Sequence, residues 1–337
     1  MRPAPGSRRS PKLGLRRTNK ARPQVPITLT GVVPAHPATA DHLDRVPTWN
    51  GDTNYNFGTC GPCSVANSAI MTWKYLAGVD ISVTDQAIFD LYRASGNPDF
   101  DPATGAGDNG VDMTVMLSAL VKQGLALTMP DGSVNVIKPL AYGQVQWPPY
   151  DDIHAVTAIF GGALGAFALD TSQQRQTDAH VWDYAPSAPW GGHACFCGAY
   201  TSATAAHQVD ESLITWMERC GTTASFLNHQ LEELYAVVWP PLWDSPDFIA
   251  GVDRAALAAD FTAITGRPFP VPVPPPTPPP GPTPPPAPVP DAALHAYLTD
   301  PQMDKWAKRW SPTTAPGSTG YAKQQYRNLQ TSEGGGA

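Results

Sequence analysis

Hydrophobic residues recur at helical spacing in the first part of the chain. Val65, Ala69 and Trp73 share one helix face, and Gly78 follows them as a typical helix end. The same spacing predicts two more helices, over 82–96 and 113–123. Thr84 or Ser82 would cap the first of these, because a hydroxyl there can accept a backbone N–H of the first turn.

The second part of the chain mixes helical and strand-like runs. Its pattern predicts, in order, a helix at 151–162, strands at 165–170, 192–200 and 212–218, a helix at 223–234 and a strand at 235–239. Helices come first and strands later, rather than alternating along the chain. The sequence therefore predicts an α+β fold.

Composition divides the chain into five parts. Residues 1–45 form a basic extended arm, 46–245 a catalytic-type body, 246–266 an accessory helix, 267–290 a proline-rich linker, and 291–337 a short helical docking module with a polar tail. The linker contains many of the 38 prolines and has no apolar periodicity. We therefore expect it to be an extended polyproline segment.

Charge is spread unevenly along the chain, whose net charge is −7. The first 22 residues hold eight Arg or Lys, and the first acidic residue is Asp41. The remainder carries 14 basic and 29 acidic side chains. A basic arm ahead of an acidic body is typical of either a solvated tail or docking on an anionic surface. Nucleic acid is an expected partner only through this arm.

No targeting or membrane segment is expected. No run approaches the ~18 apolar residues of a membrane span, and no apolar region follows the early arginines as in a secretory signal. The sequence thus predicts cytoplasmic synthesis. Five cysteines in 337 residues do not suggest a disulfide scaffold.

The string Cys60-Gly-Pro-Cys63 is compatible with three kinds of chemistry. A thioredoxin-type redox site needs a buried strand before the first cysteine, but residues 48–59 are polar and rich in Gly and Asn. A zinc site could form with Cys195 and Cys197, which alternate on one face of a predicted strand. These two residues are equally typical of small core side chains.

The third kind of chemistry is a cysteine nucleophile paired with a histidine. His193 follows two glycines and begins a predicted strand, 133 residues after Cys60, a separation typical of such pairs. A cysteine that opens a helix is also activated by the helix dipole. This pairing favours nucleophilic catalysis, with no metal and no cofactor expected.

Two motifs carry a resemblance to a known family. NYNFGTCGPCSVAN (54–67) and GGHACFCGAY (191–200) resemble the papain-like cysteine peptidase superfamily. They are most similar to its bacteriocin-processing (C39-like) branch and to related bacterial and phage peptidase-like proteins. The matching positions are Asn54, Cys60, Gly61, Gly192, His193, Ala194, Gly198 and Tyr200. The resemblance covers 46–240 and implies a papain-like fold, with the cysteine in a helical part and the histidine on an antiparallel sheet.

The resemblance implies that Cys60 is the nucleophile and His193 its base. Were Cys63 the nucleophile, Phe57 would stand six residues before it, where an amide donor to the oxyanion is expected. The same offset from Cys60 gives Asn54, which can donate. We therefore assign the catalytic roles to Cys60, His193 and Asn54.

The third catalytic group departs from the family pattern. Relatives carry Asn or Asp after the second strand, where this chain reads LITWMER (213–219). Thr215 stands near the expected place, but neither it nor Asp210 is a convincing partner for the histidine. The sequence therefore predicts a Cys/His dyad.

The predicted function is a cysteine peptidase or amidase that cleaves a peptide or amide bond through a thioester. Its substrate would be a peptide or protein, peptidoglycan peptides included. The alternative is a structural or assembly protein that keeps the fold, as part of a phage particle. The arm and the C-terminal module favour contacts with other subunits or a larger assembly.

Overall fold

The computed structural model describes residues 12–16, 36–145, 151–203, 205–252, 254–265 and 268. The chain divides into two units, Met1–Pro275 and Pro276–Ala337. The described residues all belong to the first unit. The predicted docking module and, apart from Pro268, the proline-rich linker lie outside the described residues.

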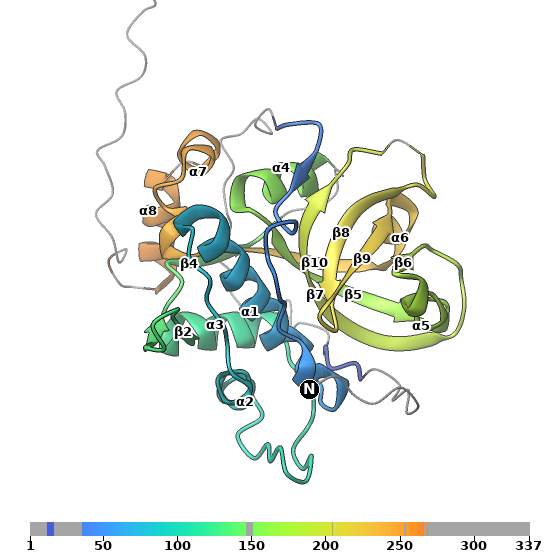
Figure 1. Ribbon diagram of the computed structural model, residues 1–337, viewed down its shortest axis with the longest axis horizontal. Coiled ribbons are helices and arrows are strands. Elements are labelled where there is room, and N and C mark those ends of the chain that lie inside the picture. The colour runs from blue at the N-terminus through green and yellow to red at the C-terminus, as the bar shows by residue number, and fades with distance from the viewer. Residues whose placement is uncertain are drawn as a thin grey trace, which may run out of the picture. The chain divides into compact units, whose positions relative to one another are not determined.

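The first unit combines helices with strands, as expected for an α+β fold (Figure 1). Its helices are α1 (Cys60–Thr72), α2 (Asp85–Ala94), α3 (Met113–Gln123), α4 (Asp151–Phe160), α5 (Thr171–Gln176), α6 (Ala224–Gln230), α7 (Pro246–Gly251) and α8 (Arg254–Thr265). Shorter turns of helix are η1 (Asp52–Tyr55), η2 (Trp73–Ala77), η3 (Thr177–Ala179) and η4 (Pro240–Leu242).

The strands come mostly after the helices α1 to α3. They are β1 (Ala40–Asp41), β2 (Leu125–Thr128), β3 (Val134–Ile137), β4 (Ala141–Gln144), β5 (Ala163–Asp170), β6 (Val181–Trp182), β7 (Pro189–Tyr200), β8 (Val209–Thr215), β9 (Glu218–Thr223) and β10 (Leu231–Val238). In the described part, one sheet runs in the order β4-β10-β5-β7-β8-β9-β6, with β1 on β7, and β2 pairs with β3. The pairs around β7 are antiparallel.

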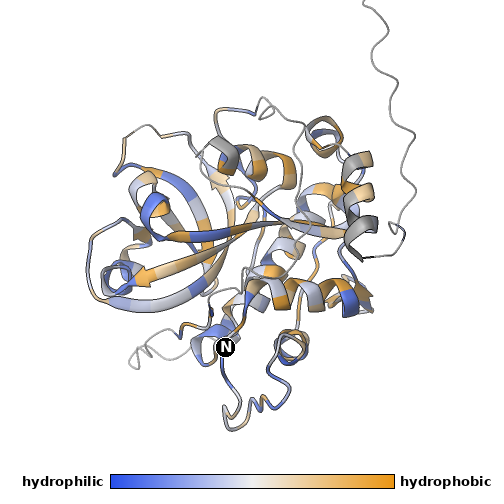
Figure 2. Ribbon diagram, turned by 180° about the vertical axis from the view of Figure 1, so that it is seen from behind, coloured by the Kyte–Doolittle hydropathy of each residue, from blue (hydrophilic) through white to orange (hydrophobic). Residues whose placement is uncertain are grey.

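Strand β7 is buried on both faces from His193 to Tyr200, and the two faces belong to two hydrophobic clusters. Ala194 and Phe196 join the cluster that contains α1, α2 and α3, whereas Cys195 and Cys197 join the cluster inside the curved sheet. Figure 2 shows hydrophobic residues concentrated on these strands and helices, with many polar residues in the outer loops. The helical part and the sheet therefore meet along β7.

Helix α1 is buried along its whole length, because it packs against β7. Its polar side chains have partners: the Asn67 carbonyl oxygen accepts the Asn50 backbone N–H at 2.7 Å, and the Ser68 hydroxyl accepts the Trp239 indole N–H at 3.1 Å. These bonds remove the cost of burying polar groups in a core helix. The helical segment ends at Gly78, whose φ of +66° is typical of a helix C-terminus.

The local helix signals were confirmed more often than the boundaries between helix and strand. Thr84 caps α2 by accepting the Ala87 N–H at 3.2 Å, and Gly124 follows α3 with φ +85°. The helix expected at 223–234 ends earlier, at Gln230, because Leu231 already pairs with Phe167 of β5. The described residues contain no helix with the length and hydrophobicity that a membrane span requires.

Candidate active site

Cys60 is the first residue of α1, as the sequence predicts. Its thiol is fully buried, and burial is the main influence that raises its pKa to about 11. Hydrogen bonds from the backbone N–H groups of Ala194, Gly14 and Gly61 act in the opposite direction. Ala194 is the neighbour of His193 on β7, so the thiol lies at the strand that carries the predicted base.

Cys63 lies one turn later and has different surroundings. Its thiol is 3.3 Å from the Thr53 hydroxyl and 3.8 Å from the Thr59 hydroxyl. Burial raises its pKa to about 12, against the effect of these hydrogen bonds. Cys63 therefore contacts side chains of the loop before α1, whereas Cys60 faces backbone N–H groups of β7 and of the arm.

His193 lies on β7 with its two ring nitrogens in different situations. Nε2 is 2.8 Å from the Thr215 hydroxyl of β8, whereas Nδ1 is buried and has no hydrogen-bond partner among the described residues. The ring stacks on Trp216 at a centroid distance of 4.4 Å. Burial lowers the pKa of His193 to about 3, so the imidazole is neutral in this structure.

Thr215 is a site residue that the sequence reasoning set aside. The predicted Cys/His dyad omits it, yet it is the described side chain that hydrogen-bonds the imidazole. Trp216 and Met217 follow it in a tight turn between β8 and β9, with φ of +45° and +67°. Such values are costly for bulky residues, and they place the indole ring against His193. No Asn-Gly pair marks this turn in the sequence, so the usual hairpin signal is missing.

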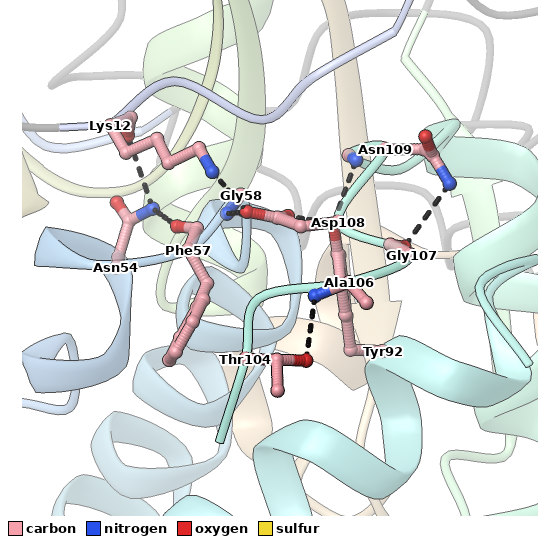
Figure 3. Close-up of polar contacts among 11 residues, drawn as sticks. Lys12, Asn54, Phe57, Gly58, Tyr92, Thr104, Ala106, Gly107, Asp108 and Asn109 are labelled. Carbon is pink, nitrogen blue, oxygen red and sulfur yellow. Dashed lines mark hydrogen bonds and ion pairs between the residues drawn. The ribbon is translucent and has the colours of Figure 1, made fainter. Parts of the chain in front are cut away.

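Asn54 lies in η1, and its side-chain amide faces two backbone carbonyls (Figure 3). Nδ2 donates to the Phe57 oxygen at 3.0 Å and to the Lys12 oxygen at 3.3 Å. The bond to Phe57 fixes the amide, and the second hydrogen is directed at a carbonyl of the arm. When the Lys12 carbonyl is absent, this second hydrogen can donate to an oxyanion in its place.

Residues 12–16 of the arm contact Asn54, Cys60 and Gly192, the residue before His193; we call them the arm segment. Lys12 contacts the Asn54 amide, Gly14 contacts the Cys60 thiol, and the Leu15 N–H donates to the Gly192 oxygen, next to His193, at 3.0 Å. On its other side the segment bonds to Val111: the Arg16 N–H donates to the Val111 oxygen, and the Val111 N–H to the Gly14 oxygen, each at 2.7 Å.

The arm segment is therefore a peptide strand held between the helical part and β7. Leu15 bridges β7 at Gly192 in antiparallel fashion and Val111 in parallel fashion. A cavity of about 420 Å³ lies beside it; residues lining it include Leu15, Asp170, Tyr184, Gly192, His229 and Glu232. The fold thus presents backbone groups that pair with an extended peptide directly over Cys60.

Asp108 ties the arm segment to the loop before α1 (Figure 3). Its carboxylate accepts the Gly58 N–H at 3.0 Å and the Tyr92 hydroxyl at 2.6 Å, and it forms an ion pair with the Lys12 ammonium. Gly58 is two residues before Cys60. Asp108 therefore connects three separate parts of the chain at the predicted active site.

The four-cysteine arrangement considered for zinc is divided between the two hydrophobic clusters. Cys60 and Cys63 belong to the cluster under α1, and Cys195 and Cys197 to the cluster inside the sheet. All five cysteines are free and buried. Across the described ranges, no group of three or more His, Cys, Asp or Glu is placed to hold a metal ion.

Comparison with known proteins finds matches in structure but not in sequence. No family model matches the chain, and no curated protein matches it. Xylellain, a cysteine protease from Xylella fastidiosa, is similar with 12% identity and a TM-score of 0.51 over 70% of this chain and 99% of its own. ProCathepsin B S9 from Trypanosoma congolense is 13% identical, with a TM-score of 0.47 over 68% of this chain and 86% of its own.

At such low identity the likeness concerns the fold. Xylellain is covered almost completely, and the match spans most of the described residues of this chain. The observed arrangement is also the one expected for that fold, with the cysteine at the start of a buried helix and the histidine on an antiparallel sheet. The chain therefore has the fold of the papain-like cysteine proteases.

Proposed function

We propose that this chain is a cysteine peptidase or amidase in which Cys60 is the nucleophile, His193 the general base and acid, and Asn54 a donor to the oxyanion. One observation carries the proposal: the arm segment, an extended peptide, touches Asn54, Cys60 and the residue before His193 at the same time. The motifs that point to Asn54, Cys60 and His193 lie at 54–67 and 191–200 and do not include the arm.

The first chemical step forms a bond between the Cys60 sulfur and a substrate carbonyl carbon. The thiol proton passes to His193 Nδ1, because Nε2 is already engaged by Thr215. The carbonyl oxygen becomes an oxyanion, which the Cys60 backbone N–H and the Asn54 Nδ2 stabilise. Removing one donor of this kind typically costs about 10²-fold or more in rate.

The second step breaks the carbon–nitrogen bond and leaves a thioester. His193 returns its proton to the departing amine and then takes one from water, which attacks the thioester and releases the acid. Thr215 would hold the imidazole through Nε2, which leaves Nδ1 available to take the proton. Trp216, stacked on the ring, would restrict its rotation.

The arm segment makes the described conformation a latent one. With the segment in place, burial keeps the Cys60 thiol and the His193 imidazole neutral, with pKa values of about 11 and about 3. Attack needs the reverse charge distribution, thiolate and imidazolium. We therefore expect activity only after the arm segment has left the site.

The test compares Cys60→Ser with Cys63→Ser in the full chain after limited proteolysis of the arm. Hydrolysis of a fluorogenic peptide library and covalent labelling by a thiol-directed epoxide should be abolished by Cys60→Ser and retained by Cys63→Ser. Loss of both signals in Cys63→Ser, with Cys60→Ser unaffected, would move the nucleophile to Cys63. Absence of turnover and labelling in the unmutated chain would favour the structural or assembly alternative.

Three finer parts of the proposal have only the sequence as support. They are membership of the C39-like branch, a place in a phage particle, and a peptidoglycan peptide as substrate. A role in assembly would use the basic arm and the unit at Pro276–Ala337. Deleting that unit should leave thiol reactivity unchanged and weaken association with particles; unchanged association would contradict the assembly role.

A further inference from the structure

Asp108 is a buried carboxylate with one cationic neighbour. Its side chain is only 3% exposed, although it lies in the loop between α2 and α3. Two of its partners are neutral donors of the body: the Tyr92 hydroxyl and the Gly58 N–H. Among the described residues, the Lys12 ammonium is the single cation in contact with it, and Lys12 comes from the arm.

Lys12 is recognised at two points at once (Figure 3). Its backbone carbonyl accepts a hydrogen bond from Asn54, the predicted oxyanion donor, and its ammonium pairs with Asp108. The Lys12 side chain remains 48% exposed, so an incoming peptide can reach the same position from solvent. The residue whose backbone carbonyl lies at the Asn54 amide therefore has its side chain beside Asp108, which favours a positive charge there.

We propose that Asp108 determines specificity by selecting a basic side chain in the substrate peptide, and that Lys12 occupies this position in the latent chain. The inference rests on the proposed function and adds the substrate class: peptides with Lys or Arg at the residue that replaces Lys12. Departure of the arm removes the counter-charge of Asp108 but leaves both neutral donors in place. A lysine or arginine of the substrate restores the ion pair.

The carboxylate is held in position before any substrate binds. Tyr92 donates to Asp108 at 2.6 Å, and the same hydroxyl accepts the Gly110 N–H at 2.7 Å. Asn97 in turn donates to the Gly110 oxygen at 2.9 Å. Because these bonds fix the acidic group in advance, little ordering is needed when a cation arrives, which favours tight binding.

A purely structural role for Asp108 would have different consequences. Its bond to Gly58 also positions the loop that leads to Cys60. If that were its whole role, loss of the charge would weaken every peptide alike. Asp108→Asn keeps an oxygen that can accept the Gly58 N–H but loses the negative charge. Tyr92→Phe removes a hydrogen bond to Asp108 but keeps the charge, and it is the matched control.

The binding experiment uses the full chain carrying Lys12→Ala together with Gly14→Ala: the first change removes the arm's own cation, and the second releases the arm segment, because a Cβ on Gly14 would overlap the Gly58 backbone. The probes are two fluorescent pentapeptides, Lys-Leu-Gly-Leu-Arg and Met-Leu-Gly-Leu-Arg, which differ in the charge of one side chain. We expect the lysine peptide to bind about tenfold more tightly, as for a partly exposed pair with one buried partner. Adding Asp108→Asn should reduce this preference to within about twofold, and adding Tyr92→Phe should preserve it.

The proposal would be overturned if Asp108→Asn still bound the lysine peptide about tenfold more tightly, or if that change weakened the binding of both peptides by the same factor. The binding readout needs no catalysis, so it separates this inference from the proposed function. If the lysine preference depends on Asp108 but no variant hydrolyses either peptide after arm proteolysis, the specificity stands and the enzymatic proposal fails. If hydrolysis occurs with equal kcat/KM for lysine and methionine substrates, the enzyme stands and Asp108 does not select them.

Discussion

Replacing Gly14 tests whether the arm segment covers Cys60. A Cβ atom built on Gly14 would overlap the backbone of Gly58, so Gly14→Ala requires the segment or the Gly58 loop to move. The Gly58 loop is held by Asp108 and leads directly into α1, which is fully buried. We therefore expect the segment to leave and the body to stay folded.

The magnitude follows from the bonds that hold the segment. Three backbone hydrogen bonds join it to Gly192 and Val111, at 2.7 to 3.0 Å. A net contribution of about 0.5–1.5 kcal/mol for each gives roughly 1.5–4.5 kcal/mol in total. Because about 1.4 kcal/mol corresponds to a factor of ten, their loss should raise the exposed fraction of Cys60 at least about tenfold.

The assay is the rate of iodoacetamide modification at pH 8, followed by peptide mapping of each cysteine. Cys60 should react at least about tenfold faster in Gly14→Ala than in the unmutated chain. The buried residues Cys195 and Cys197 should stay unmodified in both, which excludes general unfolding. Gly132→Ala is the control for backbone strain alone, since Gly132 has a φ of +81° but open space around it, far along the chain from the arm. An unchanged rate at Cys60 would refute the covering role.

Three further predictions concern buried polar groups. Thr215→Val should destabilise the fold by about 1–3 kcal/mol, because His193 Nε2 loses its partner, and Thr215→Ser should restore stability in a urea titration. Stability should fall as pH drops from 6.5 toward 3, where His193 gains a proton only when unfolded; His193→Gln should flatten that slope. Burial, with Asp210 beside it, raises the pKa of Glu211, so the unfolded carboxyl ionises first and stability is lost as pH rises above 4.5. Glu211→Gln should therefore stabilise the fold at pH 8 more than at pH 4, as urea midpoints would measure; equal gains would contradict the raised pKa.

The features that the sequence predicted well have local physical causes. The start of α2 follows from the Thr84 hydroxyl, and the end of α3 from Gly124 at positive φ. Such signals act within one helical turn, so they can be recognised in the sequence. The predicted end of α6 was wrong because Leu231 pairs with Phe167 of β5, which is 64 residues away. No local pattern encodes that pairing.

The site shows the same division between local and distant causes. Cys60, His193 and Asn54 could be selected because a motif surrounds each of them. Thr215 is not part of the predicted dyad because a hydroxyl beside a tryptophan is not a distinctive pattern, yet the register of β8 against β7 brings it to the imidazole. The position of a residue across a strand pair depends on the whole sheet.

Asp108 had no signal at all in the sequence. An aspartate in a Gly- and Asn-rich loop is usually exposed, and its burial here depends on Tyr92 of α2 and on Gly58 before α1. The arm segment is similar, because a basic stretch of this kind is typical of a solvated tail. Its place beside Cys60 depends on backbone pairing with Gly192 and Val111, which any extended sequence with a glycine at the tight position could make.

The ionisation of the Cys60 thiol and the release of the arm segment are therefore coupled. Burial favours the neutral forms of Cys60 and His193, and the arm segment contributes to the burial of Cys60, since the Gly14 backbone hydrogen-bonds the thiol. Water that enters when the segment leaves favours the Cys60 thiolate, so the same event uncovers the sulfur and makes it nucleophilic. Any ligand that draws the arm away must then increase alkylation of Cys60 and leave Cys63 unchanged, because the Cys63 thiol is bonded to Thr53 and Thr59 of the body and not to the arm.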